Sequence, residues 1–198
     1  MTFAQYIKLI DDLLADGKTT GPKQSEAMFG YGKLNRHRMQ RLEKTIELGY
    51  AVINAAQSAV RGQIWLIITE GWCGDAAQNI PVIEKIAAEN DKIETRYILR
   101  DENLDLMDQY LTNGARAIPK LIVLDAETLE VLDTWGSRPQ PAQKLFDDMK
   151  KDGVEKAEIL ETIQHWYNDD HSRTLQAEFV YLIGKVEDGS MMAAAKSK

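Results

Sequence analysis

The chain has 198 residues, of which 44% are hydrophobic, and this size suits one compact domain with added helices. Its formal net charge of −7 at pH 7 disfavours nucleic acid as the main partner. No apolar stretch approaches the roughly 18 to 20 residues that span a bilayer. Asp11 and Asp12 interrupt the N-terminal segment before any signal-peptide core, so we expect no membrane attachment and a cytoplasmic location.

Residues 1–60 are predicted to form an N-terminal helical extension. Apolar residues recur at three- and four-residue spacing over 2–16, which predicts an amphipathic helix that ends at Gly17. A second helix is expected over 35–48, where Lys and Arg alternate with apolar residues. We interpret its basic side as a solvated face rather than an anion-binding patch. The Ala-rich residues 51–60 predict a third helix.

Residues 61–152 alternate between strand patterns and helix patterns. The short apolar run over 63–69 is typical of a strand that is buried on both faces. The further elements expected, in order, are a helix over 74–89, a strand over 93–99, a short helix over 103–112, strands over 121–124 and 129–134, and a helix over 141–151. Strands that alternate with helices predict parallel pairing, and the last two strands predict an antiparallel hairpin at the sheet edge.

The C-terminal part is predicted to hold two more helices within residues 153–187. They are expected over 154–168 and 171–184, and each carries an apolar stripe that would pack on the core. Residues 188–198 are small and polar, so we expect a disordered tail there.

A five-residue motif follows the first predicted strand and opens the next helix. It reads Trp72-Cys73-Gly74-Asp75-Ala76. This motif resembles Trp-Cys-Gly-Pro-Cys, the active-site motif of thioredoxins. Pro81 stands where thioredoxins have the proline that kinks this helix, and the segment 114–119 resembles their Gly-Ile-Arg-Gly-Ile-Pro. Gly136 matches the glycine beside the family's substrate groove.

The resemblance implies a thioredoxin-like α/β fold, with a mixed central sheet and helices on both faces. It covers about residues 61–151, which leaves extra helices at the N- and C-terminal ends. The whole chain looks like a bacterial branch of thioredoxin-like proteins that carries a Trp-Cys-Gly-Asp motif.

The departures from the family pattern bear on chemistry. Ala76 stands where thioredoxins have the second cysteine, and Asp75 stands at the motif proline. Ile67 replaces a buried acidic residue, and Lys120 replaces the threonine after the second proline. Cys73 is the only cysteine, so the chain can form no internal disulfide and cannot resolve a mixed disulfide within one molecule.

Cys73 is expected at a helix N-terminus, where free backbone N–H groups and the helix dipole favour a thiolate. Asp75 either opposes the thiolate by like-charge repulsion or stabilises the first helical turn. Three roles stay open for Cys73: a monothiol resolved by an external thiol, a stable mixed disulfide in a sensor or adaptor, and a relic in a binding protein.

The resemblance also implies a substrate groove beside a cis-proline, where the adjacent backbone pairs with a bound peptide strand. It places the cis bond at Ile118–Pro119. The residues assigned to substrate binding are Trp72, Gly74, Arg116, Ile118, Pro119 and Gly136. For Arg116 we favour a surface side chain that packs on its own loop over one that holds a substrate carboxylate.

Two functions follow from these residues. The first is a monothiol redox protein with Cys73 and Asp75 at its centre, acting on a protein disulfide or a low-molecular-weight thiol. The alternative is a non-catalytic binding module that uses the groove at Pro119. No cofactor is implied, and we expect no metal site, because His165 and Asp169 lack companion ligands. The sequence does not indicate the oligomeric state.

Overall fold

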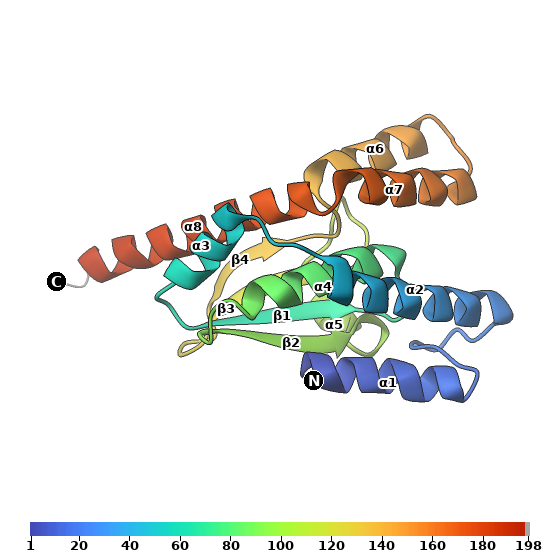
Figure 1. Ribbon diagram of the computed structural model, residues 1–198, viewed down its shortest axis with the longest axis horizontal. Helices are drawn as coiled ribbons and strands as arrows, with labels where there is room; N and C mark the ends of the chain where they lie inside the picture. Colours follow the sequence, from blue (N-terminus) through green and yellow to red (C-terminus); the bar gives the residue numbers. More distant parts are fainter. Residues whose placement is uncertain (197–198) are drawn as a thin grey trace.

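The structure of the protein is a computed structural model that describes residues 1–196. A four-stranded sheet forms its centre, with the strand order β2-β1-β3-β4 and helices on both sides (Figure 1). The elements in chain order are α1 (Phe3–Ala15), α2 (Glu26–Thr45), α3 (Tyr50–Ser58), β1 (Gln63–Thr69), α4 (Gly74–Ala87), β2 (Ile93–Leu99), a 3₁₀ turn η1 (Arg100–Glu102), α5 (Leu104–Met107), β3 (Lys120–Asp125), β4 (Val131–Trp135), α6 (Gln140–Lys151), α7 (Lys156–Asp170) and α8 (Arg173–Lys196). The predicted α/β thioredoxin-like fold is confirmed.

The sheet is mixed. Strand β1 pairs in parallel with β2 and antiparallel with β3, and β3 pairs antiparallel with β4. The alternation of strands and helices had predicted a parallel pair for β3, and this is wrong. Between β2 and β3 the chain forms only η1 and the four-residue α5. Without a long crossover helix packed on the sheet, the chain re-enters it in the reverse direction.

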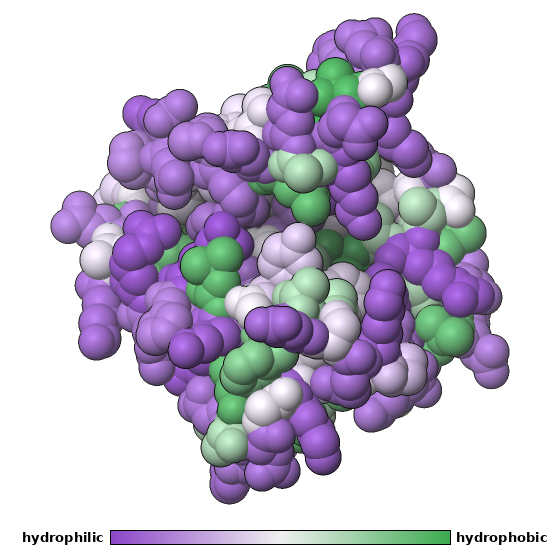
Figure 2. Space-filling model, turned by 90° about the vertical axis from the view of Figure 1, so that its right-hand side faces the viewer, coloured by the Kyte–Doolittle hydropathy of each residue, from purple (hydrophilic) through white to green (hydrophobic). Residues whose placement is uncertain are grey.

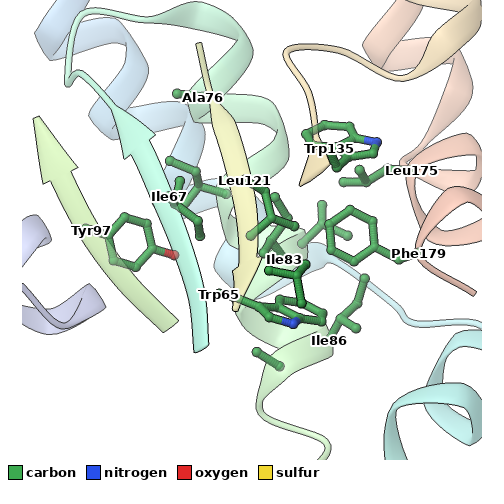
Figure 3. Close-up of a cluster of buried hydrophobic side chains, with 14 of the residues drawn as sticks. Trp65, Ile67, Ala76, Ile83, Ile86, Tyr97, Leu121, Trp135, Leu175 and Phe179 are labelled. Atoms are coloured by element: carbon green, nitrogen blue, oxygen red, sulfur yellow. The ribbon is translucent and has the colours of Figure 1, made fainter. Parts of the chain in front are cut away.

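The main core lies between the sheet and the helices α4 and α8 (Figure 3). The Phe179 ring of α8 packs edge-on against Trp65 of β1 and Trp135 of β4, with ring centroids 5.3 and 5.6 Å apart. On the β2 side, Tyr6 of α1 stacks on Tyr97 at 5.1 Å. The helices at both ends of the chain therefore supply part of the core around the sheet.

Three helices differ in extent from the sequence prediction. Helix α5 covers only Leu104–Met107 of the expected 103–112, because the chain leaves the helix in a turn after Met107. Helix α2 begins at Glu26, nine residues before the expected start, because the Ser25 side chain caps it by accepting a hydrogen bond from the Met28 N–H. Helix α8 continues to Lys196 and so includes most of the segment expected to be a disordered tail. That segment is rich in Ala and Met, which favour helix. The rest of the predicted tail, 197–198, lies outside the described residues.

Candidate functional site

Cys73 lies at the junction of β1 and α4, and it is the N-cap residue of α4. Its side chain is only 7% exposed. The Cys73 Sγ–H donates a hydrogen bond to the Ile118 carbonyl at 3.2 Å, and the sulfur accepts one from the Ala76 N–H at 3.5 Å. Burial, with a smaller contribution from the Asp75 charge, raises the pKa of the Cys73 thiol to about 12. In this structure Cys73 is a buried, protonated thiol.

Asp75 faces away from solvent into a polar cluster that joins three parts of the chain. Arg138, in the loop after β4, donates to it from Nε at 3.0 Å and from Nη2 at 2.6 Å. The Tyr167 hydroxyl of α7 donates to the same carboxylate at 3.0 Å, and Asn79 donates to that hydroxyl. Burial raises the pKa of the Asp75 carboxyl, and the Arg138 charge opposes this shift. Asp75 is therefore a structural ion-pair partner rather than a free carboxylate.

The loop that leads into the motif is held by the N-terminal part of the chain. The Gly71 N–H donates to the Thr20 hydroxyl at 2.8 Å, and the Asn35 side chain of α2 donates to the Gly71 carbonyl at 3.3 Å. A Cβ added at Gly74 would lie 3.4 Å from the Gln164 amide of α7 and 3.7 Å from Arg38 of α2. Side chains of α2 and α7 thus cover Gly74 at the start of α4.

The segment before β3 lies directly against Cys73. The Ile118–Pro119 peptide bond is cis, and both residues are buried. Gly136 has a φ of +117°, and a Cβ at this position would lie 2.3 Å from the Pro119 carbonyl oxygen. Only glycine allows the loop after β4 to come this close to the Pro119 backbone. The structure therefore brings Cys73, Gly74, Ile118, Pro119 and Gly136 together, as the sequence predicts.

The other two predicted binding residues lie at the margin. Trp72 is half-buried, and the Arg100 guanidinium lies over its ring at 4.8 Å. Arg116 is exposed and forms a two-pronged ion pair with Asp108, at 2.6 and 2.7 Å. Its guanidinium serves its own loop, which agrees with the interpretation that the sequence favoured.

Sequence reasoning missed the partners of Asp75 and two buried charged residues. Arg138 and Tyr167 are distant from the motif in the chain, and neither lies in a segment that the resemblance singled out. Glu70 is completely buried, and one of its carboxylate oxygens has no hydrogen-bond partner among the described residues. Lys120 is also buried. The one signal for Lys120 in the sequence is that it stands where thioredoxins have a threonine.

In the described part of the chain, no group of three or more His, Cys, Asp or Glu side chains is placed to hold a metal ion. His165 lies on the exposed side of α7 within 3.9 Å of Glu161. Within the same residues, no helix is long and apolar enough to cross a membrane.

The end of the molecule at which α2 begins and α6 joins α7 is shown in Figure 2. Its surface is mainly hydrophilic, and the hydrophobic side chains on it form small, separate patches. Broad apolar patches mark many protein docking surfaces. This face does not carry one.

A sequence profile described as Thioredoxin matches residues 21–150. The chain belongs to the thioredoxin family, which confirms the family predicted from the motif. The matched region includes α2 and α3, which lie outside residues 61–151, the part of the chain that the motif resemblance covers.

Two solved structures are similar over most of their length. A protein of unknown function from Pseudomonas aeruginosa is 21% identical, with 93% of this chain and 98% of that chain covered and a TM-score of 0.56. An HIV epitope scaffold is 20% identical, with the same shares covered and a TM-score of 0.55. These likenesses show the fold. No curated protein matches the chain.

Proposed function

We propose that this thioredoxin-family protein is a binding module that does not use thiol chemistry. The observation that carries the proposal is the buried Cys73 thiol, whose proton is held by the Ile118 carbonyl. With a pKa raised to about 12, only a very small fraction of Cys73 is a thiolate at pH 7.5. The thiolate is the nucleophile in thiol–disulfide exchange, so its scarcity disfavours a redox role.

The surroundings of Cys73 support the same proposal. Ala76 is fully buried where a resolving cysteine would be, and Asp75 is engaged by Arg138 and Tyr167. Neither residue has a free group to activate or release a substrate sulfur. A cytoplasmic location stays a prediction, as does a bacterial source.

A monothiol redox role is the second candidate, and one feature favours it. The Cys73 sulfur accepts a hydrogen bond from the Ala76 N–H at the start of α4, and the nearby Arg138 charge opposes part of the rise in the thiol pKa. If the covering helices moved apart, these contacts would stabilise a thiolate. A protein disulfide or a small thiol such as glutathione would then be its partner.

Alkylation of Cys73 separates the two functions. Because the chain has one cysteine, each adduct appears as a single mass shift in intact-protein mass spectrometry. We expect native protein to react with iodoacetamide at least about a hundredfold more slowly than urea-unfolded protein at pH 7.5, since burial and the raised pKa both suppress the thiolate. Incubation with glutathione disulfide should leave the native mass unchanged.

Two results would establish the redox role instead. One is an alkylation rate that is similar in native and unfolded protein. The other is a native alkylation rate that, as the pH is raised, reaches its plateau below the ordinary thiol pKa of about 8.5. The Cys73→Ser variant, unfolded by urea, gives the background for reagent that reacts with other side chains. When a binding partner has been identified, the Cys73→Ser variant should bind it as the parent protein does.

A further inference from the structure

A second feature of the molecule lies on the other side of Pro119, where the β3 strand begins. Lys120 is only 7% exposed. Its ammonium group donates to the Thr112 hydroxyl at 3.2 Å and to the Gly136 carbonyl at 3.4 Å, both neutral oxygens. Among the described residues, no carboxylate lies within ion-pair distance of it. A buried ammonium normally has a counter-charge, because leaving it unpaired is costly.

Lys120 lines a cavity of about 560 Å³ between the end of β4 and the side of α8, which run beside each other in Figure 1. Two other cations line the same cavity, and each has its own carboxylate: Arg138 pairs with Asp75 at 2.6 Å and Lys185 pairs with Asp133 at 2.8 Å. Within the described residues, Lys120 is the cation of this cavity that has no acidic partner.

The remaining walls indicate what else a ligand would need. Trp135, Tyr181 and Leu182 provide an apolar and aromatic side. Glu178 adds a carboxylate that already accepts hydrogen bonds from the Trp135 indole N–H and the Gln140 N–H, both at 2.6 Å. With Asp133 it offsets two of the three cationic side chains that line the cavity, so the lining has one excess positive charge, which matches a singly charged anion. The volume is in the range of small-molecule sites.

We propose that this cavity binds a small organic monocarboxylate, whose carboxylate pairs with Lys120 and whose apolar part packs against Trp135 and Tyr181. The inference deepens the proposed binding function, because Gly136 belongs both to this cavity and to the segment beside Cys73. It assigns a ligand class to a module for which the motif alone gives none.

Isothermal titration with three probes tests the proposal: phenylacetate, its neutral amide phenylacetamide, and inorganic phosphate. We expect phenylacetate to bind with millimolar or better affinity, and phenylacetamide and phosphate each to bind at least about tenfold more weakly. A charge-assisted hydrogen bond contributes enough to account for a tenfold difference. Lys120→Met should weaken phenylacetate binding about tenfold, whereas Lys144→Met, on an exposed face of α6, should leave it unchanged.

Tyr181→Ala keeps the proposal testable if Lys120→Met fails to fold, because Tyr181 is 74% exposed and is not needed for the core. It should weaken phenylacetate binding several-fold and leave acetate binding unchanged. The proposal is overturned if phenylacetate does not bind, if the amide or phosphate binds as well as phenylacetate, or if Tyr181→Ala and any folded Lys120→Met bind like the parent protein.

The two proposals fail separately. Cys73→Ser should bind phenylacetate like the parent chain, because Cys73 does not line the cavity. A reactive Cys73 together with Lys120-dependent binding would overturn only the proposed absence of thiol chemistry. An unreactive Cys73 together with binding that ignores Lys120 would overturn only the carboxylate site.

Discussion

At the scale of single residues, the Asp75 carboxylate links three segments that are far apart in the chain. It receives the Arg138 guanidinium from the loop after β4 and the Tyr167 hydroxyl from α7. Arg138 also lies over the Phe146 ring of α6, 4.0 Å from its centroid. Both partners of the ion pair are about nine-tenths buried. Water therefore cannot solvate either charge if the other is removed.

Replacing Arg138 should therefore be costly. We expect Arg138→Met to lower the free energy of unfolding by about 3–5 kcal/mol at pH 7.5, because it leaves the Asp75 charge buried without its partner. Urea unfolding followed by circular dichroism measures this loss. Asp75→Asn combined with Arg138→Met should recover part of it, since the stranded charge is then removed.

Arg116→Met is the matched control. It removes the same group from the exposed ion pair with Asp108, and its unfolding midpoint should stay close to that of the parent chain. If the two single variants unfold at the same urea concentration, the buried pair contributes no more to stability than the exposed pair does.

The sequence could predict which residues meet at the site only where they lie within the motif segments. Cys73, Gly74, Ile118, Pro119 and Gly136 come together as the resemblance implied. The Asp75 partners could not be found in this way. An arginine in a loop and a tyrosine on a helix are common surface residues, and only the tertiary packing shows that they converge on one carboxylate.

At the scale of elements, α8 completes the core on one side of the sheet. Its Phe179 side chain is fully buried between Trp65 and Trp135, whereas Tyr181, two positions further along the same helix, is 74% exposed. The Gln176 side chain further ties α8 to the start of α3, accepting from the Gly49 N–H at 2.7 Å. The helix thus belongs to the folded core rather than to a separate addition.

Substitutions on α8 should show this difference. We expect Phe179→Ala to lower the free energy of unfolding by about 3–5 kcal/mol, because it leaves a cavity between two tryptophans. Tyr181→Ala, the control from the opposite side of the helix, should change it by less than about 0.5 kcal/mol. Thermal and urea unfolding measure both variants. If Phe179→Ala and Tyr181→Ala changed the stability equally, α8 would not stabilise the sheet.

Elements with clear periodicity were placed well from the sequence, and those set by tertiary context were not. Strands β1 and β2 match their predicted ranges because both are compact apolar or alternating runs. The early start of α2 was missed because residues 26–34 carry a weak apolar pattern and the signal lies in the Ser25 cap. The direction of β3 depends on how the chain returns to the sheet, and the local sequence pattern does not predict that path.

At the scale of the whole molecule, Glu70 lies where the N-terminal segment, the end of β1 and the region after β2 meet. One of its carboxylate oxygens accepts from the Asp101 N–H at 2.9 Å, and the other has no partner among the described residues. Burial raises the pKa of the Glu70 carboxyl above its ordinary value. The folded protein therefore holds this proton at a pH where the unfolded chain has released it.

This difference predicts a pH-dependent effect of Glu70→Gln. As the pH rises from the unfolded pKa of about 4.3 towards the raised folded value, the parent chain loses stability, because its folded state binds more protons than its unfolded state. The variant lacks this loss, so its stability relative to the parent should increase from pH 4 to pH 7. Urea titrations at half-unit pH steps measure the difference.

Glu158→Gln, on an exposed part of α7, controls for the removal of one carboxylate. A stability difference between Glu70→Gln and the parent that stays constant, or that falls as the pH rises, would show that the folded protein does not retain the Glu70 proton.

The burial of Ala76 has a consequence for any attempt to build a dithiol site in this fold. Ala76 is wholly buried, and Cys73 beside it is only 7% exposed. Ala76→Cys would give the chain a second thiol next to Cys73, but at a position with no exposed surface. Such a pair would exchange with an external disulfide only if the packing around the start of α4 opened to admit it, so the architecture and not the missing thiol alone limits dithiol chemistry at this corner.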